Sequence, residues 1–499
     1  MVHRHIRKEV VRQLKKEFPN WKRLPKKTKK ELASKVLKEV VANYDFSQEI
    51  ETPLDELLGI EEQTTVTGIF SLEEMEQFIQ QKENSRILRF CYRDGSPLIK
   101  DEELQFIDQL INDNVINSLL AGERYDPYKR EILPSNLFRA ELLKAVKYPE
   151  ISYRKFCTEE YFGRDRKQNR VFAGLSLSRL TMIDHTQLSR FRSNLNSVQL
   201  ANLMVYFLHL FRQSGLLGKQ LIFGVDSTEL ANDCSIPLAS IEVLGQKIRI
   251  YGDLDCDCGV RRNKRDKSPH VVGYRQHTLT LIDVESKQSF PIASLIASAN
   301  HHDSKFLPFL VKLAQAMGFD LKLVTADQAY NDSNGSLHKE TGTTLVTPES
   351  PKVKRPENTD PETGAVFCHG NCEIPMQHIG CYDGEHEYKC NAEPGECMLS
   401  SSCSQYRLIA TDRGSFQRIP SISDGFQNAL DIRKNCERTF NLLKNQTGME
   451  NLRVRSQKAT LSRCTFSSIG MLLIKMAGYR KKRKPAFSQP SLLDQAANY

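Results

Sequence analysis

Two stretches of apolar residues in the middle of the chain predict buried strands. The first, LIFGVDST, covers residues 221–228, and the second, LKLVTADQAY, covers residues 321–330. Short continuous apolar runs of this kind are typical of strands that are buried on both faces of a sheet. Asp226 ends the first run and Asp327 ends the second. Each predicted strand therefore carries a carboxylate at its end.

A third stretch, DIRKNCERTFNLLK at residues 431–444, has the periodicity of a helix. Its apolar residues recur at helical spacing and predict one buried stripe. They are Ile432, Cys436, Phe440 and Leu443. Arg433, Glu437 and Lys444 are separated by four and seven residues, so that a helix presents them on roughly one face. A carboxylate between two cations suits a phosphodiester substrate, although an ordinary surface helix with an Arg–Glu ion pair explains the same pattern.

The elements around these stretches predict a mixed α/β sheet. Two further strands, a helix and a short fifth strand are expected from alternating or continuous apolar patterns and from helical periodicity. They cover residues 272–283, 290–298, 304–317 and 343–347. Strands followed by alternating helices and strands are the order of an α/β fold.

Acids at the ends of buried strands, joined by a later helical Glu, form the metal cradle of RNase H-like nucleases. In these features the sequence resembles the DDE transposases of bacterial insertion sequences. Their signature of Arg, three residues, Glu, six residues and Lys is satisfied by Arg433, Glu437 and Lys444. The Tyr that the family has three positions before the Arg is absent, because Leu430 stands there.

The resemblance implies an RNase H-like core with two Mg²⁺ or Mn²⁺ ions. On the family pattern Asp226 bridges both ions, and Asp327 and Glu437 each complete one side. Arg433 and Lys444 are then expected to hold DNA phosphates, Arg as a bidentate fork and Lys as a point charge. Acids in turns after strands, and salt bridges between neighbours on the helix, are the structural alternatives.

The function that the resemblance implies is transposition. A family member binds the terminal inverted repeats of its own element, cleaves there and joins the freed 3′ hydroxyl to target DNA, and it acts as a homodimer on paired ends. Two alternatives stay open. One is a catalytically retired, transposase-derived DNA-binding protein, and the other is a host RNase H-like nuclease that lacks strand transfer.

Residues 131–215 are expected to form a helical domain before the core. Within it, residues 183–195, IDHTQLSRFRSNL, resemble the helical domain that precedes the catalytic core in these transposases. Asp184 is a candidate N-cap for the helix that follows. Arg190 and Arg192 on that helix are candidate DNA contacts, with helix packing as the alternative for both.

Charge is concentrated at the two ends of the chain. The net charge is +9, and residues 1–30 carry twelve Lys or Arg against two acids. This favours a polyanionic partner such as DNA. We therefore interpret residues 1–130 as a mainly helical, basic, DNA-binding region and residues 479–499 as a basic tail.

A cysteine-rich segment interrupts the predicted core. We expect residues 216–347 to form the first part of the catalytic core, residues 348–423 to be an insertion, and residues 424–478 to complete the core. Several cysteines of the insertion are plausible ligands of a structural zinc ion, although their spacing is irregular and ordinary reduced thiols explain them equally. The candidate ligands are Cys372, Cys381, Cys390, Cys397 and Cys403.

Composition and the motifs that the sequence lacks limit the classes of protein that it can belong to. A chain of 499 residues with 39% hydrophobic and 26% charged content indicates a globular protein of several domains. No secretory signal, Walker loop or dinucleotide fingerprint is found, so we expect a cytoplasmic, nucleoid-associated bacterial protein without membrane attachment or a nucleotide cofactor. Asp253, Asp255 and Asp257 begin like a calcium-binding loop, but the required Gly and final Glu are missing.

Overall fold

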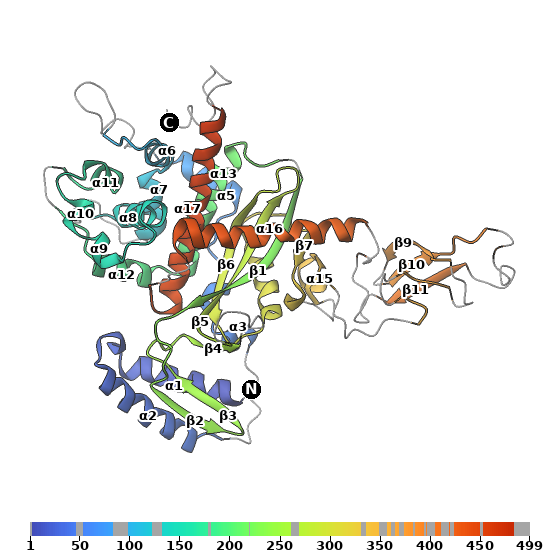
Figure 1. Cartoon of the computed structure of the whole chain (residues 1–499), viewed down its shortest axis with the longest axis horizontal. Helices are drawn as coiled ribbons and strands as arrows, with labels where there is room; N and C mark the ends of the chain where they lie inside the picture. The colour runs from blue at the N-terminus through green and yellow to red at the C-terminus, as the bar shows by residue number, and fades with distance from the viewer. Residues whose placement is uncertain are drawn as a thin grey trace.

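The computed structural model describes most of the chain in segments. They are residues 2–45, 53–82, 98–121, 132–177, 181–218, 220–260, 269–330, 336–348, 357–360, 365–368, 374–382, 385–393, 396, 405–410, 419, 424–449 and 453–483. A mixed sheet lies at the centre, helices pack around it, and two smaller units project from it (Figure 1). Among the described helices, none has the length and apolar character that a bilayer crossing requires.

Six strands form the central sheet. They are β1 (Leu221–Ala231), β4 (Asp257–Val260), β5 (His270–Asp283), β6 (Ser289–Ser298), β7 (Leu323–Ala326) and β8 (Thr344–Val346). The order is β4-β5-β1-β7-β8, and β6 also pairs with β5. β5 is antiparallel to β1 and β6, whereas β7 is parallel to β1 and β8 is parallel to β7. The predicted mixed α/β architecture is confirmed.

The first predicted strand does not end at its acid. β1 continues beyond Asp226 to Ala231, and it pairs with β5 along its whole length. Only residues 223–225 of β1 pair with β7. Asp226 therefore lies where the parallel part of the sheet ends, within a longer antiparallel ribbon.

Long helices cover the sheet. α16 (Asp424–Thr447) contacts β1, β5, β6, β7 and β8, and it lies across β1 and β7 in Figure 1. Cys436, Phe440 and Leu443 are buried and Glu437 is exposed, which confirms the amphipathic pattern of this helix. α17 (Gln457–Arg483) packs on β6 and on the helices before the sheet. α14 (Leu307–Ala316), which confirms most of the helix predicted at 304–317, also packs on β6.

The helices before the sheet share one hydrophobic core with it. The longer ones are α5 (Leu72–Gln80), α6 (Glu102–Leu110), α7 (Asp113–Ala121), α8 (Pro134–Lys147), α12 (His185–Asn194) and α13 (Ser197–Gln213). Shorter helices, α3 (Leu54–Leu58), α4 (Glu61–Thr64), α9 (Tyr153–Phe156), α10 (Glu159–Phe162), α11 (Lys167–Phe172) and α15 (Ser336–Thr341), connect them or flank the sheet. The predicted boundary near residue 130 does not separate two cores, because α5 to α7 pack with α8 and α13.

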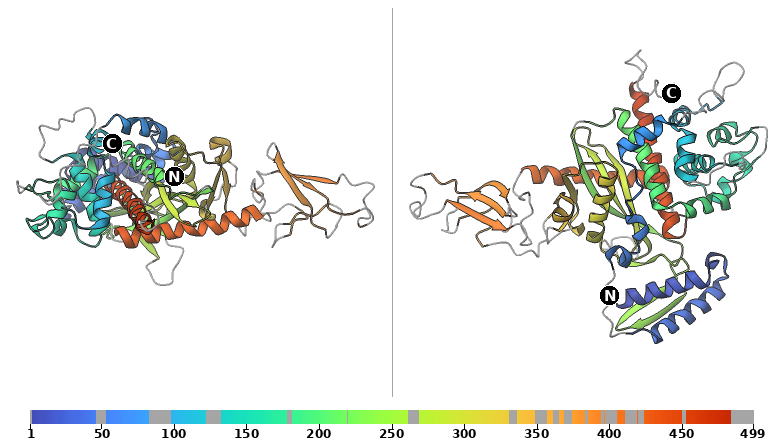
Figure 2. Two further views of the ribbon diagram at one scale, coloured as in Figure 1. Left: turned by 90° about the horizontal axis from the view of Figure 1, so that it is seen from above. Right: turned by 180° about the vertical axis from the view of Figure 1, so that it is seen from behind.

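The N-terminal helices form a smaller unit with a hairpin from the middle of the chain. α1 (Val2–Glu17) and α2 (Lys26–Ala42) pack on β2 (Ala239–Val243) and β3 (Gln246–Ile250), with their own hydrophobic core. Figure 1 and the right-hand view of Figure 2 show this unit below the central sheet. The hairpin lies between β1 and β4 in sequence, so residues 216–347 are not one uninterrupted part of the core.

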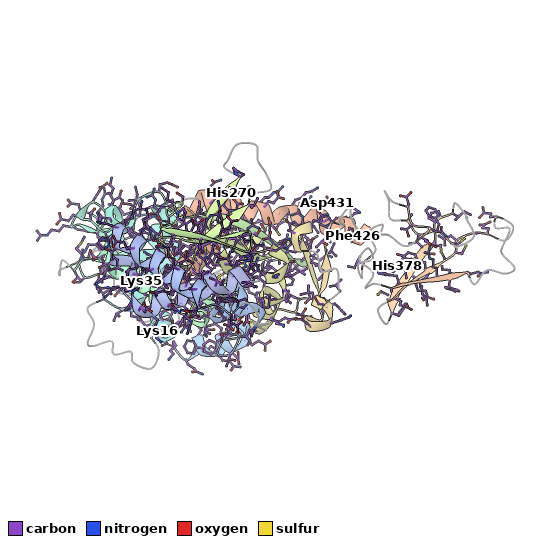
Figure 3. All side chains as sticks on the ribbon, turned by 90° about the horizontal axis from the view of Figure 1, so that it is seen from below. Lys16, Lys35, His270, His378, Phe426 and Asp431 are labelled. Atoms are coloured by element: carbon purple, nitrogen blue, oxygen red, sulfur yellow. The ribbon has the colours of Figure 1, made fainter. Side chains whose placement is uncertain are left out.

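The cysteine-rich segment contains a three-stranded antiparallel sheet of its own. Its strands are β9 (Gln377–Tyr382), β10 (Glu385–Lys389) and β11 (Tyr406–Ala410). A small core around Tyr388 and Ile409 supports this sheet. Figure 3 shows His378 at this end of the molecule, with Phe426 and Asp431 of α16 nearer to the centre and Lys16 and Lys35 towards the other end.

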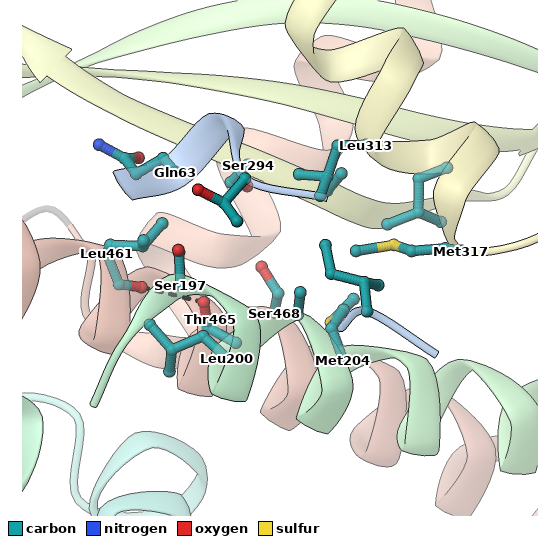
Figure 4. A pocket seen from close by; sticks show the side chains of 15 residues that line it. Gln63, Ser197, Leu200, Met204, Ser294, Leu313, Met317, Leu461, Thr465 and Ser468 are labelled. Carbon is teal, nitrogen blue, oxygen red and sulfur yellow. Dashed lines mark hydrogen bonds between the residues drawn. The ribbon is translucent and has the colours of Figure 1, made fainter. Parts of the chain in front are cut away.

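A small cavity lies between the central sheet and the helices. It has a volume of about 40 Å³, and its lining includes Ser294 of β6, Met204 of α13 and Ser468 of α17 (Figure 4). The Ser468 hydroxyl is buried and has no hydrogen-bond partner. Space of this size with a polar group suits a bound water molecule. Among the described residues, no charged side chain lines the cavity, so it is not a candidate active site.

Candidate active site

The two predicted aspartates lie on neighbouring strands. Val225 of β1 and Ala326 of β7 are register partners in the parallel pair. Asp226 and Asp327 are the next residue on each strand path, and adjacent strands are about 4.8 Å apart. The structure therefore brings together two acids that are separated by the whole of β5, β6 and α14 in sequence.

The predicted glutamate reaches the same region through α16. Cys436 of α16 is fully buried and packs against Gly224 of β1, so the helix backbone approaches the strand closely. Gly224 and Asp226 are two positions apart on β1 and point to the same face of the sheet. Glu437 follows Cys436, and its charge acts on Asp226. Asp226, Asp327 and Glu437 therefore share one electrostatic environment.

Asp226 is the acid of this group whose charged form is disfavoured by its surroundings. The pKa of Asp226 is raised to about 7, mainly by burial and in addition by the negative charges of Asp327 and Glu437. A hydrogen bond from the backbone N–H of Ser227, 2.8 Å from Oδ1 of Asp226, and the positive charge of Arg433 act in the opposite direction. A buried carboxylate with acidic neighbours is stabilised by a cation placed among them.

The cations of the Arg, Glu, Lys signature lie along α16. Nη2 of Arg433 is 3.6 Å from Oε1 of Glu437, and the side chains are 19% and 60% exposed. The local salt bridge that the sequence leaves open is therefore present. Lys444 is half-buried one turn before the end of the helix. Arg433 is placed to neutralise both Asp226 and Glu437.

The carboxylates fit a hard divalent cation by chemistry, but they are not gathered at coordination distance. Mg²⁺ prefers carboxylate oxygens and keeps several waters, so three acids are a suitable donor set. Within the described segments, no group of three His, Cys, Asp or Glu side chains stands close enough to hold one ion. Glu437 is exposed and paired with Arg433, so a change of its rotamer is required before it joins the two aspartates.

A polar network that the sequence did not reveal supports the acids from the other side of the sheet. Ser227, the neighbour of Asp226, donates from its hydroxyl to Oδ2 of Asp303 at 3.2 Å, and Nη1 of Arg275 donates to Oδ1 of Asp303 at 2.7 Å. Tyr330 hydroxyl lies 2.9 Å from Nδ1 of His277. Burial lowers the pKa of His277 to about 3, so this ring is neutral.

The same network fixes the turn that carries Asp327. The backbone N–H of Tyr330 donates to the carbonyl of Asp327 at 3.1 Å, and the N–H of Ala329 donates to Oδ1 of Asp327 at 3.0 Å. One member of this network could have been suspected from the sequence, because Tyr330 lies in the same predicted strand-and-turn stretch as Asp327. His302 caps the 3-10 helix Asp303–Phe306, and Asp303 forms an ion pair with Arg275.

The two arginines of α12 differ in exposure. Arg190 is exposed, so it stays a candidate DNA contact. Arg192 is buried, pairs with the fully buried Glu141 of α8, and its guanidinium lies 3.9 Å from the ring centroid of Tyr153. Arg192 therefore takes the packing role and is not available to DNA. Asp184 caps the helix as predicted, accepting from the backbone N–H of Thr186 at 2.7 Å.

Two of the five candidate zinc ligands lie in the described part of the chain. Cys381 lies on β9 and Cys390 follows β10, and both side chains are half-buried. Cys372, Cys397 and Cys403 lie outside the described residues. Next to these thiols, Nε2 of His378 lies 3.0 Å from Nδ1 of His386. The zinc site stays a prediction.

Comparisons with known proteins give a loose structural likeness. No model of a known protein family matches the chain, and no curated protein matches it either. Among solved structures, the chain is similar to the piggyBac transposase in a synaptic complex with hairpin DNA, at 13% sequence identity and a TM-score of 0.25. The match covers 80% of this chain and 83% of that one. This overlap is too loose to define the fold or the activity of the chain.

Proposed function

We propose that the protein is a DDE transposase that cleaves DNA at the ends of its element and joins them to target DNA. One observation carries this proposal. Asp226 and Asp327 follow register partners of two parallel strands, and α16 crosses β1 so closely that Glu437 acts on the charge of Asp226. Two strand acids and a later helical Glu on a mixed sheet are the arrangement of an RNase H-like catalytic core.

The acids would hold divalent cations, with Asp226 shared between two ions and Asp327 and Glu437 on either side. Such ions activate the attacking oxygen, stabilise the leaving oxygen and neutralise charge on the phosphoryl group. Asp226 is half-buried, and this partial desolvation of its carboxylate favours binding to a cation. Arg433, once released from Glu437, has a guanidinium fork that matches a phosphate of the bound strand.

The partners in this proposal are DNA and a second copy of the chain. Terminal inverted repeats and target DNA are the substrates, and a homodimer holds the paired ends, as the family resemblance implies. Arg190 and Lys444 would contribute phosphate contacts beside Arg433. A bacterial nucleoid is the corresponding location.

Metal-dependent cleavage of DNA tests the proposal. The purified chain is incubated with a plasmid that carries its gene with the flanking DNA, in Mg²⁺, in Mn²⁺ or in EDTA. Nicking that requires the metal and is lost in Asp226→Asn and Glu437→Gln is expected. Asp431→Asn is the matched control, because Asp431 lies on the same helix and is 72% exposed. Nicking by the Asp226→Asn variant at the rate of the wild type would overturn the assignment.

A second readout separates the related functions. A labelled end joined to unlabelled target DNA is expected of a transposase, whereas nicking without joining indicates a host nuclease. The exposed Glu437 and the absence of a three-ligand cluster in the described segments favour one further candidate, a retired transposase that only binds DNA. That candidate predicts DNA binding with no metal-dependent nicking.

Structural zinc in the cysteine-rich insertion is a separate proposal. Cys381 and Cys390 belong to a small sheet with a core of only a few buried residues, and such units commonly need a metal or disulfides for stability. We expect the purified chain to contain zinc by elemental analysis and to lose it in the Cys381→Ser/Cys390→Ser variant. Cys157→Ser, outside the insertion, is the control. A zinc-free wild-type chain purified under reducing conditions would show that the thiols are ordinary.

A further inference from the structure

A large cleft separates the N-terminal unit from the central sheet. It has a volume of about 610 Å³ and lies between α1, β3, the end of β6 and the start of α17. Among the described residues, eight Lys or Arg side chains and five carboxylates line it. The cleft is separate from the acids of the candidate active site, since none of Asp226, Asp327 and Glu437 lines it.

The carboxylates of the cleft are already neutralised by cations. Nε of Arg7 is 3.2 Å from Oδ2 of Asp257, and Nζ of Lys15 is 2.6 Å from Oδ1 of Asp255. Arg7 also donates to the carbonyl of Cys256 at 2.6 Å. The other pairs are Lys8 with Glu56 and Glu61, and Lys458 with Glu62. The contacts of Arg7, Lys8 and Lys15 hold the N-terminal unit against the rest of the molecule.

Arg12 pairs with Glu9 of its own helix, so three cations of the lining are left over. Arg4, Lys247 and Arg249 make no side-chain hydrogen bond or ion pair with the part of the chain that the structure describes. Arg4 precedes Arg7 by three residues and shares its helix face. The backbone carbonyl of Arg249 accepts from Nε of Arg7 at 3.4 Å, so β3 and α1 meet here. The unpaired cations thus come from both walls of one corner of the cleft.

A buried histidine lies in the same corner without a partner. His301 is 8% exposed, lines the cleft, and its Nδ1 has no hydrogen-bond partner. The pKa of His301 is lowered to about 3, mainly by burial and in addition by the charges of Arg4 and Arg7, so the ring is neutral and its cationic neighbours are close. An unpaired buried polar atom is unfavourable, and a ligand with matching groups would satisfy it.

We propose that this cleft binds the phosphodiester backbone of DNA, with Arg4 and Arg249 as the phosphate contacts, Lys247 beside them at the rim and His301 as a hydrogen-bonding group at the floor. The proposal rests on the proposed function, and it assigns the DNA contact of the N-terminal unit to the inner side of α1. Unpaired Arg side chains on two walls suit an extended polyanion, because each can fork onto a separate phosphate.

The proposal also links the cleft to the active site through the sheet. His301 is two residues before Asp303, which accepts from Ser227, the residue next to Asp226. DNA held in the cleft would therefore contact the segment after β6 that also carries Asp303. The outward lysines of α2 are not required for this contact.

Equilibrium binding tests the cleft without any catalytic step. The full chain is titrated into a short fluorescent DNA duplex in EDTA, over a series of salt concentrations. The Arg4→Glu/Arg249→Glu variant is expected to lose affinity at least about tenfold and to lower the slope of log K against log salt by about two. The control is Arg154→Glu/Arg164→Glu, which makes the same charge change at two exposed positions of the helical domain.

A third variant separates binding from folding. His301→Phe replaces an unpaired polar ring by an apolar one of similar shape, so stability should be unchanged or higher. DNA affinity should nevertheless fall, by roughly fivefold, the equivalent of a lost hydrogen bond of about 1 kcal/mol. Unchanged affinity in both cleft variants, or an equal loss in the control, would overturn the proposal.

The experiments distinguish an error in the proposed DNA-binding cleft from an error in the proposed transposase function. Binding in EDTA does not use the metal-holding acids, so Asp226→Asn is expected to bind DNA like the wild type. A chain that binds through the cleft but never nicks DNA would refute transposition and leave the cleft assigned. A chain that nicks DNA and is unaffected by the cleft variants would refute the cleft alone.

Discussion

A Cβ atom added to Gly224 of β1 would lie 2.3 Å from the sulfur of Cys436 on α16 and 3.0 Å from Cδ1 of Ile282. The first distance is well inside van der Waals contact, so a side chain at position 224 and the present position of the helix exclude each other. Glu437 follows Cys436, and Asp226 lies two residues after Gly224. The glycine therefore sets how near the helical acid comes to the strand acid.

Gly224→Ala should displace α16 and uncouple Glu437 from Asp226. We expect a loss of about 1–3 kcal/mol in the free energy of unfolding, which is typical of an overpacked core, together with a large loss of DNA cleavage. Thermal or denaturant unfolding and the plasmid-nicking assay measure the two effects. Gly224→Ala/Cys436→Ala should recover most of both, because the sulfur that clashes is gone. Gly425→Ala, which meets nothing within 4 Å on the same helix, is the control.

The pKa of Asp226 predicts how stability depends on pH. The usual value of 3.8 applies in the unfolded chain, and the folded value is about 7. Between these values the folded state keeps a proton that the unfolded state releases. Stability therefore falls as pH rises through this window, and the penalty is complete above pH 7.

Asp226→Asn removes that penalty in the metal-free protein. Relative to the wild type, the variant should gain stability as pH rises towards 8, by on the order of 2–4 kcal/mol, and gain little below pH 4. Denaturant unfolding in EDTA across this pH range is the measurement. Adding Mg²⁺ should stabilise the wild type and not the variant. Parallel stability curves for the two proteins would show that Asp226 is not held in this environment.

The strands and the helix that depend only on the local pattern of apolar residues could be predicted from the sequence. The apolar runs around Asp226 and Asp327 became β1 and β7, and the periodicity of residues 431–444 gave the buried stripe of α16. Their apposition was expected only through the family resemblance. Sequence order does not state which strands pair, and the register of Val225 with Ala326 is a tertiary property.

The remaining features depend on contacts between distant segments. The charge pattern of α1 predicts a basic surface for DNA. In the structure, Arg7 and Lys15 of this helix pair with Asp257 and Asp255, which are more than two hundred residues away in sequence. The charge pattern of a helix does not reveal whether its partner is nucleic acid or an acidic loop of the same chain. Arg192 shows the same ambiguity, because burial against Glu141 decides its role.

Arg190 is exposed and Arg192 is buried, so the same substitution at the two positions should change the free energy of unfolding by very different amounts. Arg192→Met leaves the buried carboxylate of Glu141 without its cation and should cost about 3–5 kcal/mol. Arg190→Met should change stability by no more than about 0.5 kcal/mol, since the residue is exposed, and should weaken DNA binding. Arg192→Met/Glu141→Gln should recover much of the loss. Equal stability of the two single variants would contradict the buried pair.

The network behind the acids predicts a positioning role for Tyr330. Tyr330→Phe removes the hydroxyl next to Nδ1 of His277 and loosens the turn that carries Asp327, so the rate of cleavage should fall by on the order of 10–100-fold. Stability should fall by only about 1–3 kcal/mol. Tyr206→Phe is the matched control, because its buried hydroxyl donates to the carbonyl of Leu110 at 3.0 Å, away from the acids. It should lose similar stability while its cleavage rate, measured well below the unfolding temperature, stays near that of the wild type. If both variants lose activity in proportion to stability, the hydroxyl of Tyr330 supports the fold and does not position Asp327.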